Sequence, residues 1–338
     1  MTRITLDGGI KVRTFTPPPC DFDPITASPA DLFKHGFPAR PDHPEHLERY
    51  KRVFGLMKDR FQYIEPTFRI NPNRRHGTAA SRHFAGAVDV KPPVVGTGNQ
   101  ISSIWSGGLV FPPTGMSFRW ISGEWTVPNV SAPADGQTYY CATWIGIDGD
   151  KSVPSNDLCQ AGINLDVTRN GNNISRDCAA WCEWFPGPEL GIPNFPVTFG
   201  DTVVITICTT GIGATEALIF FANMTGGFGT SFFLEAGQFQ DGSQISLLGD
   251  SAQWVVERPA VNGATALLAN YAEVFFSGCV AVAYSADGTS SEVVDGGTEV
   301  RIDMLPLGAP YPAGILSRGV LVADTVVQCM FEAPGTGQ

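Results

Sequence analysis

The amino-acid sequence predicts an all-β protein: a sandwich of two antiparallel β-sheets preceded by a partly helical N-terminal segment. Two observations carry this prediction. Short β-branched or aromatic runs bounded by turn residues recur along the chain, such as DTVVITICTT, YAEVFFSGCVAVAY and GVLVADTVVQC, and such runs are typical of antiparallel sandwiches and barrels. The 38 glycines and 26 prolines favour many turns over long helices.

The first hundred residues differ in character from the rest, so we expect two parts, residues 1–100 and residues 101–338. In PDHPEHLERYKRVFGLMKDRF, apolar residues recur every three or four positions, at Leu47, Tyr50, Phe54, Met57 and Phe61. This spacing predicts an amphipathic helix that begins near residues 42–44. Pro-rich stretches lie around it, and KPPVVGTGNQ at 91–100 is typical of a linker.

Charge is divided unevenly between the two parts. Residues 1–104 hold 15 of the 22 Lys and Arg against 10 acidic residues, whereas residues 105–338 hold 7 against 23. All five histidines lie in the first part. The chain is therefore a basic N-terminal segment, of net charge +5, attached to an acidic body of net charge −16. Because so few bases remain when carboxylates protonate, the body is suited to acid, although an ordinary acidic protein fits the charge equally well.

The composition of the body excludes several chemistries. Without histidine it cannot contain a Ser-His-Asp or Cys-His triad or a His-ligated metal, and it has no phosphate-binding glycine loop. We expect no cofactor and no metal. A body at −16 would repel nucleic acid, and no apolar run approaches the length of a membrane span. Acid–base chemistry must therefore come from carboxylates, assisted by amides or hydroxyls.

The N-terminus and the cysteines bear on localisation. MTRITLDGGIKVRTFTPPP lacks the apolar core of a secretory signal, yet we expect a secreted or extracytoplasmic protein, and a monomer. Eight cysteines could form four bridges of unknown connectivity. Cys178 and Cys182, four residues apart, are candidates for a local bridge.

Six stretches of the body, taken in order, form a pattern. They are SSIWSGG, GEWTVPNV, YYCATWIGIDGD, DLCQAG, WCEWFPGPE and SAQWVVERP. From about residue 101 to the C-terminus the chain resembles the glutamic peptidases (eqolisins, family G1 or A4). The resemblance implies a concanavalin- or jelly-roll-like sandwich with a substrate cleft, a polypeptide substrate and a glutamine–glutamate pair as the catalytic groups. The glutamate moves protons, and the glutamine amide stabilises the oxyanion.

Carried over residue by residue, the family glutamine falls on Gln160, and the family glutamate, placed just before the tryptophan of its E-W-I-V-E segment, falls on Gln253. Other matches imply residues that line or support the cleft: Trp105, Trp144, Asp148, Glu183, Phe185 and Glu257. Phe185 replaces a common tyrosine, and Asn164 an expected aspartate.

With an amide at 253, the resemblance implies a folded but strongly impaired enzyme, because general acid–base catalysis is worth about 10²–10⁴-fold. Glu257 lies about 13 Å further along the same strand at ~3.3 Å per residue, so we expect that it cannot easily substitute for a carboxylate at 253. Gln253 is either the mark of a natural pseudoenzyme or an isosteric change that keeps a self-cleaving precursor intact. The second interpretation is preferred, because members of the family carry basic prosegments.

A basic prosegment docked on the acidic body at neutral pH would loosen in acid, when carboxylates are neutralised and histidines charged. We expect processing between Pro92 and Ser103, just before the first matched motif.

Two other functions remain open. The body could be a non-catalytic sandwich that binds peptides or glycans. It could also be a glycoside hydrolase that uses Glu183 and Glu257, which requires their carboxyl groups to lie about 5–9.5 Å apart.

Overall fold

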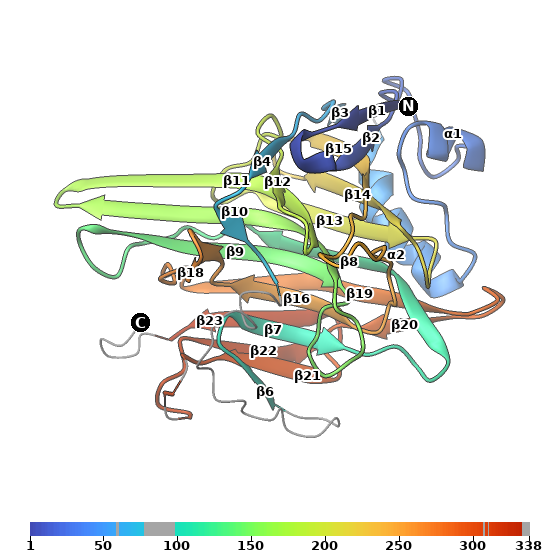
Figure 1. The fold of residues 1–338 in the computed structure, drawn as a ribbon. Helices are drawn as coiled ribbons and strands as arrows, with labels where there is room; N and C mark the ends of the chain where they lie inside the picture. Colours follow the sequence, from blue (N-terminus) through green and yellow to red (C-terminus); the bar gives the residue numbers. More distant parts are fainter. Residues whose placement is uncertain (59–60, 78–98, 307, 310, 333–338) are drawn as a thin grey trace.

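Two antiparallel sheets pack face to face in the computed structural model, which describes residues 1–58, 61–77, 99–306, 308–309 and 311–332 (Figure 1). One sheet, which we call the cleft sheet, carries the candidate site. Its strands, in spatial order, are β21 (Val300–Met304), β7 (Trp105–Val110), β16 (Ala252–Glu257), β9 (Gln137–Ile147), β10 (Leu158–Asn170), β11 (Asn173–Phe185), β12 (Glu189–Gly191) and β4 (Arg69–Asn71).

The second sheet, the outer sheet, lies behind the first. Its strands, in spatial order, are β1 (Thr2–Thr5), β2 (Lys11–Thr14), β15 (Phe228–Glu235), β14 (Glu216–Asn223), β13 (Thr202–Thr209), β8 (Met116–Thr126), β19 (Glu273–Ser285) and β20 (Ser291–Asp295). The sheets are continuous at one edge through β23 (Val326–Phe331) and β22 (Ser317–Ala323), which link β19 to β21. The predicted antiparallel sandwich is confirmed.

Alternation along the strands separates the two faces of the cleft sheet. On β16, Trp254 points into the core between the sheets, where its Nε1 donates to the Ser122 carbonyl of β8 at 2.9 Å. Its neighbour Val255 packs on the opposite face with Trp105 and Trp144. Since successive strand residues face opposite sides, Gln253 and Glu257 share the face of Val255.

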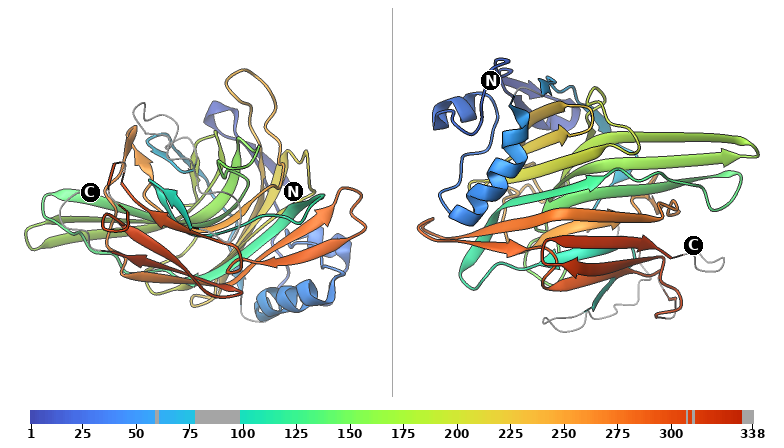
Figure 2. Two further views of the ribbon diagram at one scale, coloured as in Figure 1. Left: turned by 90° about the horizontal axis from the view of Figure 1, so that it is seen from below. Right: turned by 180° about the vertical axis from the view of Figure 1, so that it is seen from behind.

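The predicted amphipathic helix is present and covers the outer sheet. Helix α2 (Pro44–Phe54) continues into a 3-10 turn at Gly55–Met57, and α1 (Pro29–Lys34) precedes it. Tyr50 and Phe54 are fully buried against the sheet, with the Phe54 ring 5.1 Å from that of Phe220 on β14. From behind, α2 is seen crossing this face (Figure 2).

The N-terminal residues extend both sheets with short strands. β1 and β2 form a hairpin on β15, β3 (Gln62–Tyr63) pairs with β15, and β4 pairs with β12. β5 (Arg74–Arg75) pairs with β17 (Ala260–Val261), which forms a hairpin with β18 (Ala264–Thr265), and β6 (Asn99–Ser102) pairs with β21. Most of the expected processing interval, residues 92–98, lies outside the described residues.

All eight cysteines are free thiols. Cys178 and Cys182 lie four residues apart on β11, a spacing of about 13 Å along a strand, so the expected local bridge is excluded. None of the helices in the described residues is long and apolar enough to cross a membrane.

Helix α2 depends on its aromatic face for attachment. Phe54→Ala removes a fully buried ring, and we expect it to lower the free energy of unfolding of the α2 region by about 3–5 kcal/mol. Leu56, which is 50% exposed, is the matched control, and Leu56→Ala is expected to cost less than about 0.5 kcal/mol. Hydrogen exchange of the α2 amides measures both, and equal effects would contradict this packing.

Candidate active site

Five neighbouring strands, β7, β16, β9, β10 and β11, bring the predicted cleft residues together. In the register of the cleft sheet, Gln160 on β10 lies opposite Glu183 on β11, and Glu257 on β16 lies opposite Trp105 on β7. Because paired residues share a face, their side chains project from the face away from the core, together with Trp144. All five are buried, and Gln160, Glu183 and Glu257 are each 0% exposed.

Glu257 is held by four hydrogen bonds. The indole Nε1 atoms of Trp144 and Trp105 donate to its two carboxylate oxygens at 2.8 and 3.2 Å. The other two donors come from the N-terminal segment: the backbone N–H of Gly77 at 3.0 Å and Nδ1 of His76 at 3.0 Å. A buried carboxylate needs such partners, and here half of them belong to a separate stretch of chain.

Gln160 lies on the other side of the same glycine. A Cβ placed on Gly77 would lie 3.2 Å from the Gln160 Nε2 atom and 2.9 Å from Leu158 Cδ2, and its φ of +92° favours glycine. Among the described residues neither amide atom of Gln160 has a hydrogen-bond partner. Gly77 therefore lies next to both the amide of Gln160 and the carboxylate of Glu257.

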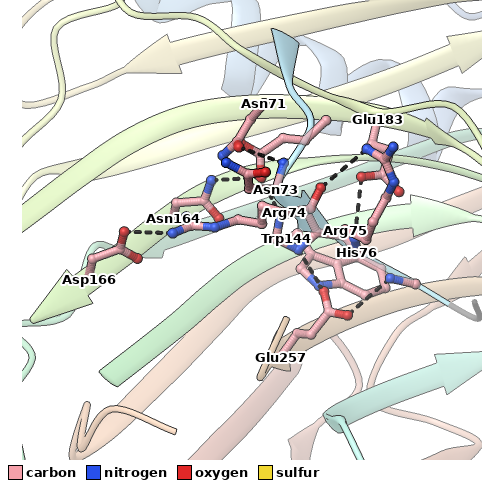
Figure 3. Close-up of polar contacts among 12 residues, drawn as sticks. Asn71, Asn73, Arg74, Arg75, His76, Trp144, Asn164, Asp166, Glu183 and Glu257 are labelled. Carbon is pink, nitrogen blue, oxygen red and sulfur yellow. Dashed lines mark hydrogen bonds and ion pairs between the residues drawn. The ribbon is translucent and has the colours of Figure 1, made fainter. Parts of the chain in front are cut away.

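The side chain of His76 lies between acidic side chains on the cleft face of the sheet (Figure 3). Its ring stacks on Trp181 with centroids 3.6 Å apart, its Nε2 bonds Glu189 at 2.7 Å, and its backbone N–H donates to Glu183 at 3.3 Å. Burial alone would lower the pKa of His76, but hydrogen bonds to Glu189 and Glu257 outweigh it and raise the pKa to about 9. The imidazole is therefore charged at neutral pH.

Arg74 anchors the segment two residues upstream. Its guanidinium bonds Asp166 on β10 at 2.6 Å and lies 5.3 Å from the ring centre of Tyr140 on β9. The backbone around it is fixed by the pairing of β5 with β17, extended by a hydrogen bond from Asn262 N to Asn73 O at 2.8 Å. The short strand Arg74–Arg75 is thus held against the cleft sheet, between a turn at Asn73 and a bend at Gly77.

Gln253 belongs to a different network. Its Nε2 donates to the Asp148 carbonyl at 3.0 Å and to Ser251 Oγ at 2.9 Å. Asp148, with a φ of 70°, accepts the backbone N–H groups of Leu248 and Asp250 at 2.8 and 2.9 Å. These contacts hold a turn, and they direct the Gln253 amide away from Gly77.

Other side chains fill the space between Gln160 and Gln253. Both residues pair with Gly146 on the central strand β9. A Cβ on Gly146 would lie 2.8 Å from Leu158 Cδ1 and 3.1 Å from Trp144 Cζ3, so these two side chains cover the sheet at that point.

Phe185 and Asn164 border the site without touching Gly77. Phe185 is half-buried at the end of β11 and packs against the aromatic cluster of the cleft face. Asn164 donates to Glu189 at 3.1 Å and so orients the acid that contacts His76. Burial raises the pKa of Glu183 well above its usual range.

Sequence reasoning missed the contribution of the N-terminal segment to this site. The basic run NPNRRHG contains Arg74, His76 and Gly77, and the matched motif WCEWFPGPE ends at Glu189. No sequence motif pointed to Asp166. The one available signal was charge, because a basic run has to find acidic partners on a body with so few bases. In the part of the chain that the structure describes, no group of three or more His, Cys, Asp or Glu side chains is placed to hold a metal ion.

Comparison with known proteins agrees with this architecture. Aspergillopepsin-2 of Aspergillus niger is 25% identical over 221 residues, which are 60% of this chain and 68% of the relative. The structure of scytalido-glutamic peptidase with a transition-state analogue inhibitor superposes with a TM-score of 0.52 at 21% identity, covering 68% of this chain and 99% of that one. SCP-B, a member of the eqolisin family, gives a TM-score of 0.49 at 21% identity, with the same coverage.

A family model described as the peptidase A4 family matches residues 103–304, which are more than half of the chain and include Trp105, Trp144, Gln160, Glu183 and Glu257. The chain therefore belongs to the peptidase A4 family, the glutamic peptidases.

Proposed function

We propose that this chain is the precursor of an acid-acting endopeptidase whose catalytic pair is Gln160 and Glu257. One observation carries the proposal: Gly77 lies next to the amide of Gln160, which has no hydrogen-bond partner among the described residues, and its N–H donates to the carboxylate of Glu257. A peptide bond in this position has the carboxylate of Glu257, a group that can carry protons, at its nitrogen. It also has the amide of Gln160, a hydrogen-bond donor, beside it.

In this proposal the bond between His76 and Gly77 occupies the reacting position. Glu257 takes a proton from water as the water attacks the carbonyl carbon of residue 76, and the Gln160 amide donates to the oxyanion that forms. Glu257 then passes the proton to the nitrogen of residue 77 as the C–N bond breaks. Trp105 and Trp144 hold the carboxylate in one orientation throughout, through the indole donors described above.

Position 253 is then a supporting residue. The amide of Gln253 donates to the Asp148 carbonyl and to Ser251, and Leu158 and Trp144 pack over Gly146, the β9 residue with which residues 160 and 253 both pair. In this proposal a glutamine at position 253 removes no proton-carrying group from the enzyme. Its presence then requires neither that the chain be a pseudoenzyme nor that the residue was introduced.

Residues before Gly77 act as a prosegment in this proposal. They fill the cleft at neutral pH through the contacts of His76 and Arg74, and acid loosens them chiefly by protonating the body's carboxylates. His76 departs from the expectation that acid would charge the histidines, because it is charged already. His46 on α2 follows that expectation: burial, together with the nearby charges of His43 and Arg49, lowers its pKa to about 4, so charging it in acid weakens the helix docking.

Buried carboxylates support acid action and an acidic, extracytoplasmic setting. Burial, and then the charges of Asp157 and Asp250, raise the pKa of Asp148 well above its usual range. Burial likewise raises the pKa of Asp157 to about 6, although it accepts a hydrogen bond from Trp184 Nε1 at 2.7 Å. These groups are satisfied as neutral acids, so the fold is better suited to low pH than to neutral pH.

A glycosidase is the less supported alternative. Glu183 and Glu257 do contact neighbouring backbone N–H groups of one segment, at His76 and Gly77, so both reach a common ligand. That ligand is a peptide whose main chain pairs with β17, and main-chain pairing is a mode of peptide recognition.

A pair of conservative variants tests the catalytic assignment. We expect Glu257→Gln to reduce self-processing and cleavage of an unfolded protein in acid by at least about 10²–10⁴-fold, because the proton carrier is lost. Gln253→Glu is the matched control; it places a carboxylate against the Asp148 carbonyl and is expected to bring no gain in rate. An unaltered chain that cuts nothing, together with a Gln253→Glu chain that does, would overturn the assignment.

The charge of His76 predicts how docking depends on pH. Its raised pKa stabilises the docked segment fully below about pH 6.5, by about 3 kcal/mol, and this contribution is lost as the pH rises through about 9. In acid it is lost again once Glu189 becomes neutral: burial would raise the pKa of Glu189, but the hydrogen bond and charge of His76 outweigh it and lower that pKa. Hydrogen exchange of residues 62–77, corrected for intrinsic rates, should show maximal protection near neutral pH. His76→Leu should flatten that profile, and an unchanged profile in the variant would contradict the ion pairs.

Asp157 predicts how the stability of the body depends on pH. Because its folded-state pKa is about 6 against an unfolded value near 3.9, the folded state loses stability as the pH rises through this interval. In a Glu257→Gln background, which blocks self-cleavage, Asp157→Asn should raise the free energy of unfolding by up to about 3 kcal/mol at pH 7 and change it little near pH 3.5. Urea denaturation at the two pH values measures this, and an equal effect at both would contradict it.

A further inference from the structure

The N-terminal segment attaches to the body at two separate places. Its last residues, 69–77, reach the cleft sheet, where the charged contacts of Arg74 and His76 hold them. Residues 1–57, which we call the docked module, lie on the outer sheet, on the other side of the sandwich from the candidate active site (Figure 2). The two attachments rest on different forces, so a cut in the chain affects them differently.

The first part of the docked module is built into the outer sheet by main-chain pairing. Strand β2 continues that sheet beyond β15, with Val12 opposite Leu234 and Thr14 opposite Phe232. Val12 is 0% exposed and belongs to the core between the two sheets. Strand β2 therefore gives the body both main-chain partners for β15 and a core side chain.

The second part of the docked module covers an apolar face. One buried cluster contains five of its large side chains, Leu32, Phe37, Tyr50, Phe54 and Met57. Their partners on β8, β13, β14 and β19 are Trp120, Val204, Phe220, Ala222, Val280 and Val282. Neighbours of these partners on the same strands face the core between the sheets, so the partners themselves face outward. Without the module they would form an exposed apolar patch of a kind that monomeric soluble proteins rarely carry.

Ion pairs at the margin of this interface add less than the apolar cluster does. Arg49 on α2 bonds Asp295 on β20 at 2.9 Å, and Arg3 on β1 bonds Glu235 on β15 at 2.6 Å. All four side chains are partly exposed, and exposed pairs contribute little. Burial of apolar surface, which does not depend on a protonation state, therefore carries most of the attachment.

His46 is a titratable group inside the interface. It is 2% exposed, its ring packs edge-on against Trp120 with centroids 4.6 Å apart, and neither ring nitrogen has a hydrogen-bond partner among the described residues. Burial, followed by the charges of His43 and Arg49, lowers the pKa of His46 to about 4. At pH 6 the ring is therefore neutral, and the interface buries no charge at this point.

We propose that residues 1–57 are a lasting second chain of the processed enzyme: they stay bound to the outer sheet after the bond between His76 and Gly77 is cut, and only the residues in the cleft leave it. The inference rests on the proposed function for the place of the cut, whereas the docking itself is the same whatever makes the cut. Processing then opens the cleft while the apolar face stays covered and β15 stays paired.

A chain that an added protease cuts shows whether the module is retained. The recognition sequence of a site-specific protease replaces residues 84–90, and Arg74→Ala with His76→Ala removes the charged contacts of the cleft. After the cut, gel filtration at pH 6 separates free from bound fragment over a series of dilutions. We expect the N-terminal fragment to elute together with the body at about 1 μM. Elution of the two as separate species would overturn the inference.

A pair of variants in the same cut chain tests which contacts hold the fragment. Phe54→Ala removes a fully buried ring and should raise the dissociation constant of the fragment by at least about 100-fold. Leu56→Ala, at a position that is 50% exposed, is the matched control and should change it by less than about threefold. Circular dichroism of the uncut chains shows that both variants fold. Equal retention of the two fragments would contradict docking through the apolar face.

Self-processing distinguishes this inference from the function beneath it. After incubation in acid and return to pH 6, the unaltered chain should yield a fragment ending at His76 that elutes with the body. A chain that cuts itself there but sheds this fragment would overturn the inference and leave the peptidase assignment in place. A chain that never cuts itself would overturn the proposed function, and the two-chain enzyme with it, even where the fragment made by the added protease stays bound.

Discussion

The burial of one carboxylate organises this molecule. Glu257 has no contact with solvent, and a carboxylate in that position must be supplied with hydrogen-bond donors. Two of them, Trp105 and Trp144, belong to the cleft sheet, and two, His76 and Gly77, arrive with the N-terminal segment. When the segment leaves, the indoles still orient the carboxylate, and its other face opens to water and substrate. The proposed catalytic group and the proposed point of attachment are thus the same side chain.

The uneven charge of the chain gives one set of contacts two uses. A basic segment meets an acidic body through His76 and Arg74, and their partners Glu189 and Asp166 lie next to aromatic rings that favour cations. In the proposed function these contacts both attach the segment at neutral pH and place the reacting bond in the cleft. The buried acids Asp148 and Asp157, whose pKa values burial raises, support the proposed action in acid.

Local patterns were sufficient to predict the fold and part of the site. Alternation predicted the sandwich, and spacing predicted α2; the order of the motifs placed Gln160, Glu183 and Glu257 in one cleft. The motif order assigned the family glutamate to position 253 and a supporting role to Glu257, but strand alternation does not separate the two, because four residues along a strand return to the same face. The difference lies in neighbours distant in sequence: Leu158 and Trp144 cover the sheet beside Gln253, and the segment ending at Gly77 reaches Glu257 across 180 residues. Charge balance indicated that the basic run must meet acids, but pairing His76 with Glu189 required the folded register.

The most direct test follows the first cut that the purified chain makes in itself. Mass spectrometry at short times after a shift to acid identifies the fragments, with Glu257→Gln measured alongside. The account predicts that the first N-terminal fragment ends at His76 and that the variant stays intact. A first cut elsewhere in the chain, made equally fast by Glu257→Gln, would contradict the placement of the reacting bond between Gln160 and Glu257.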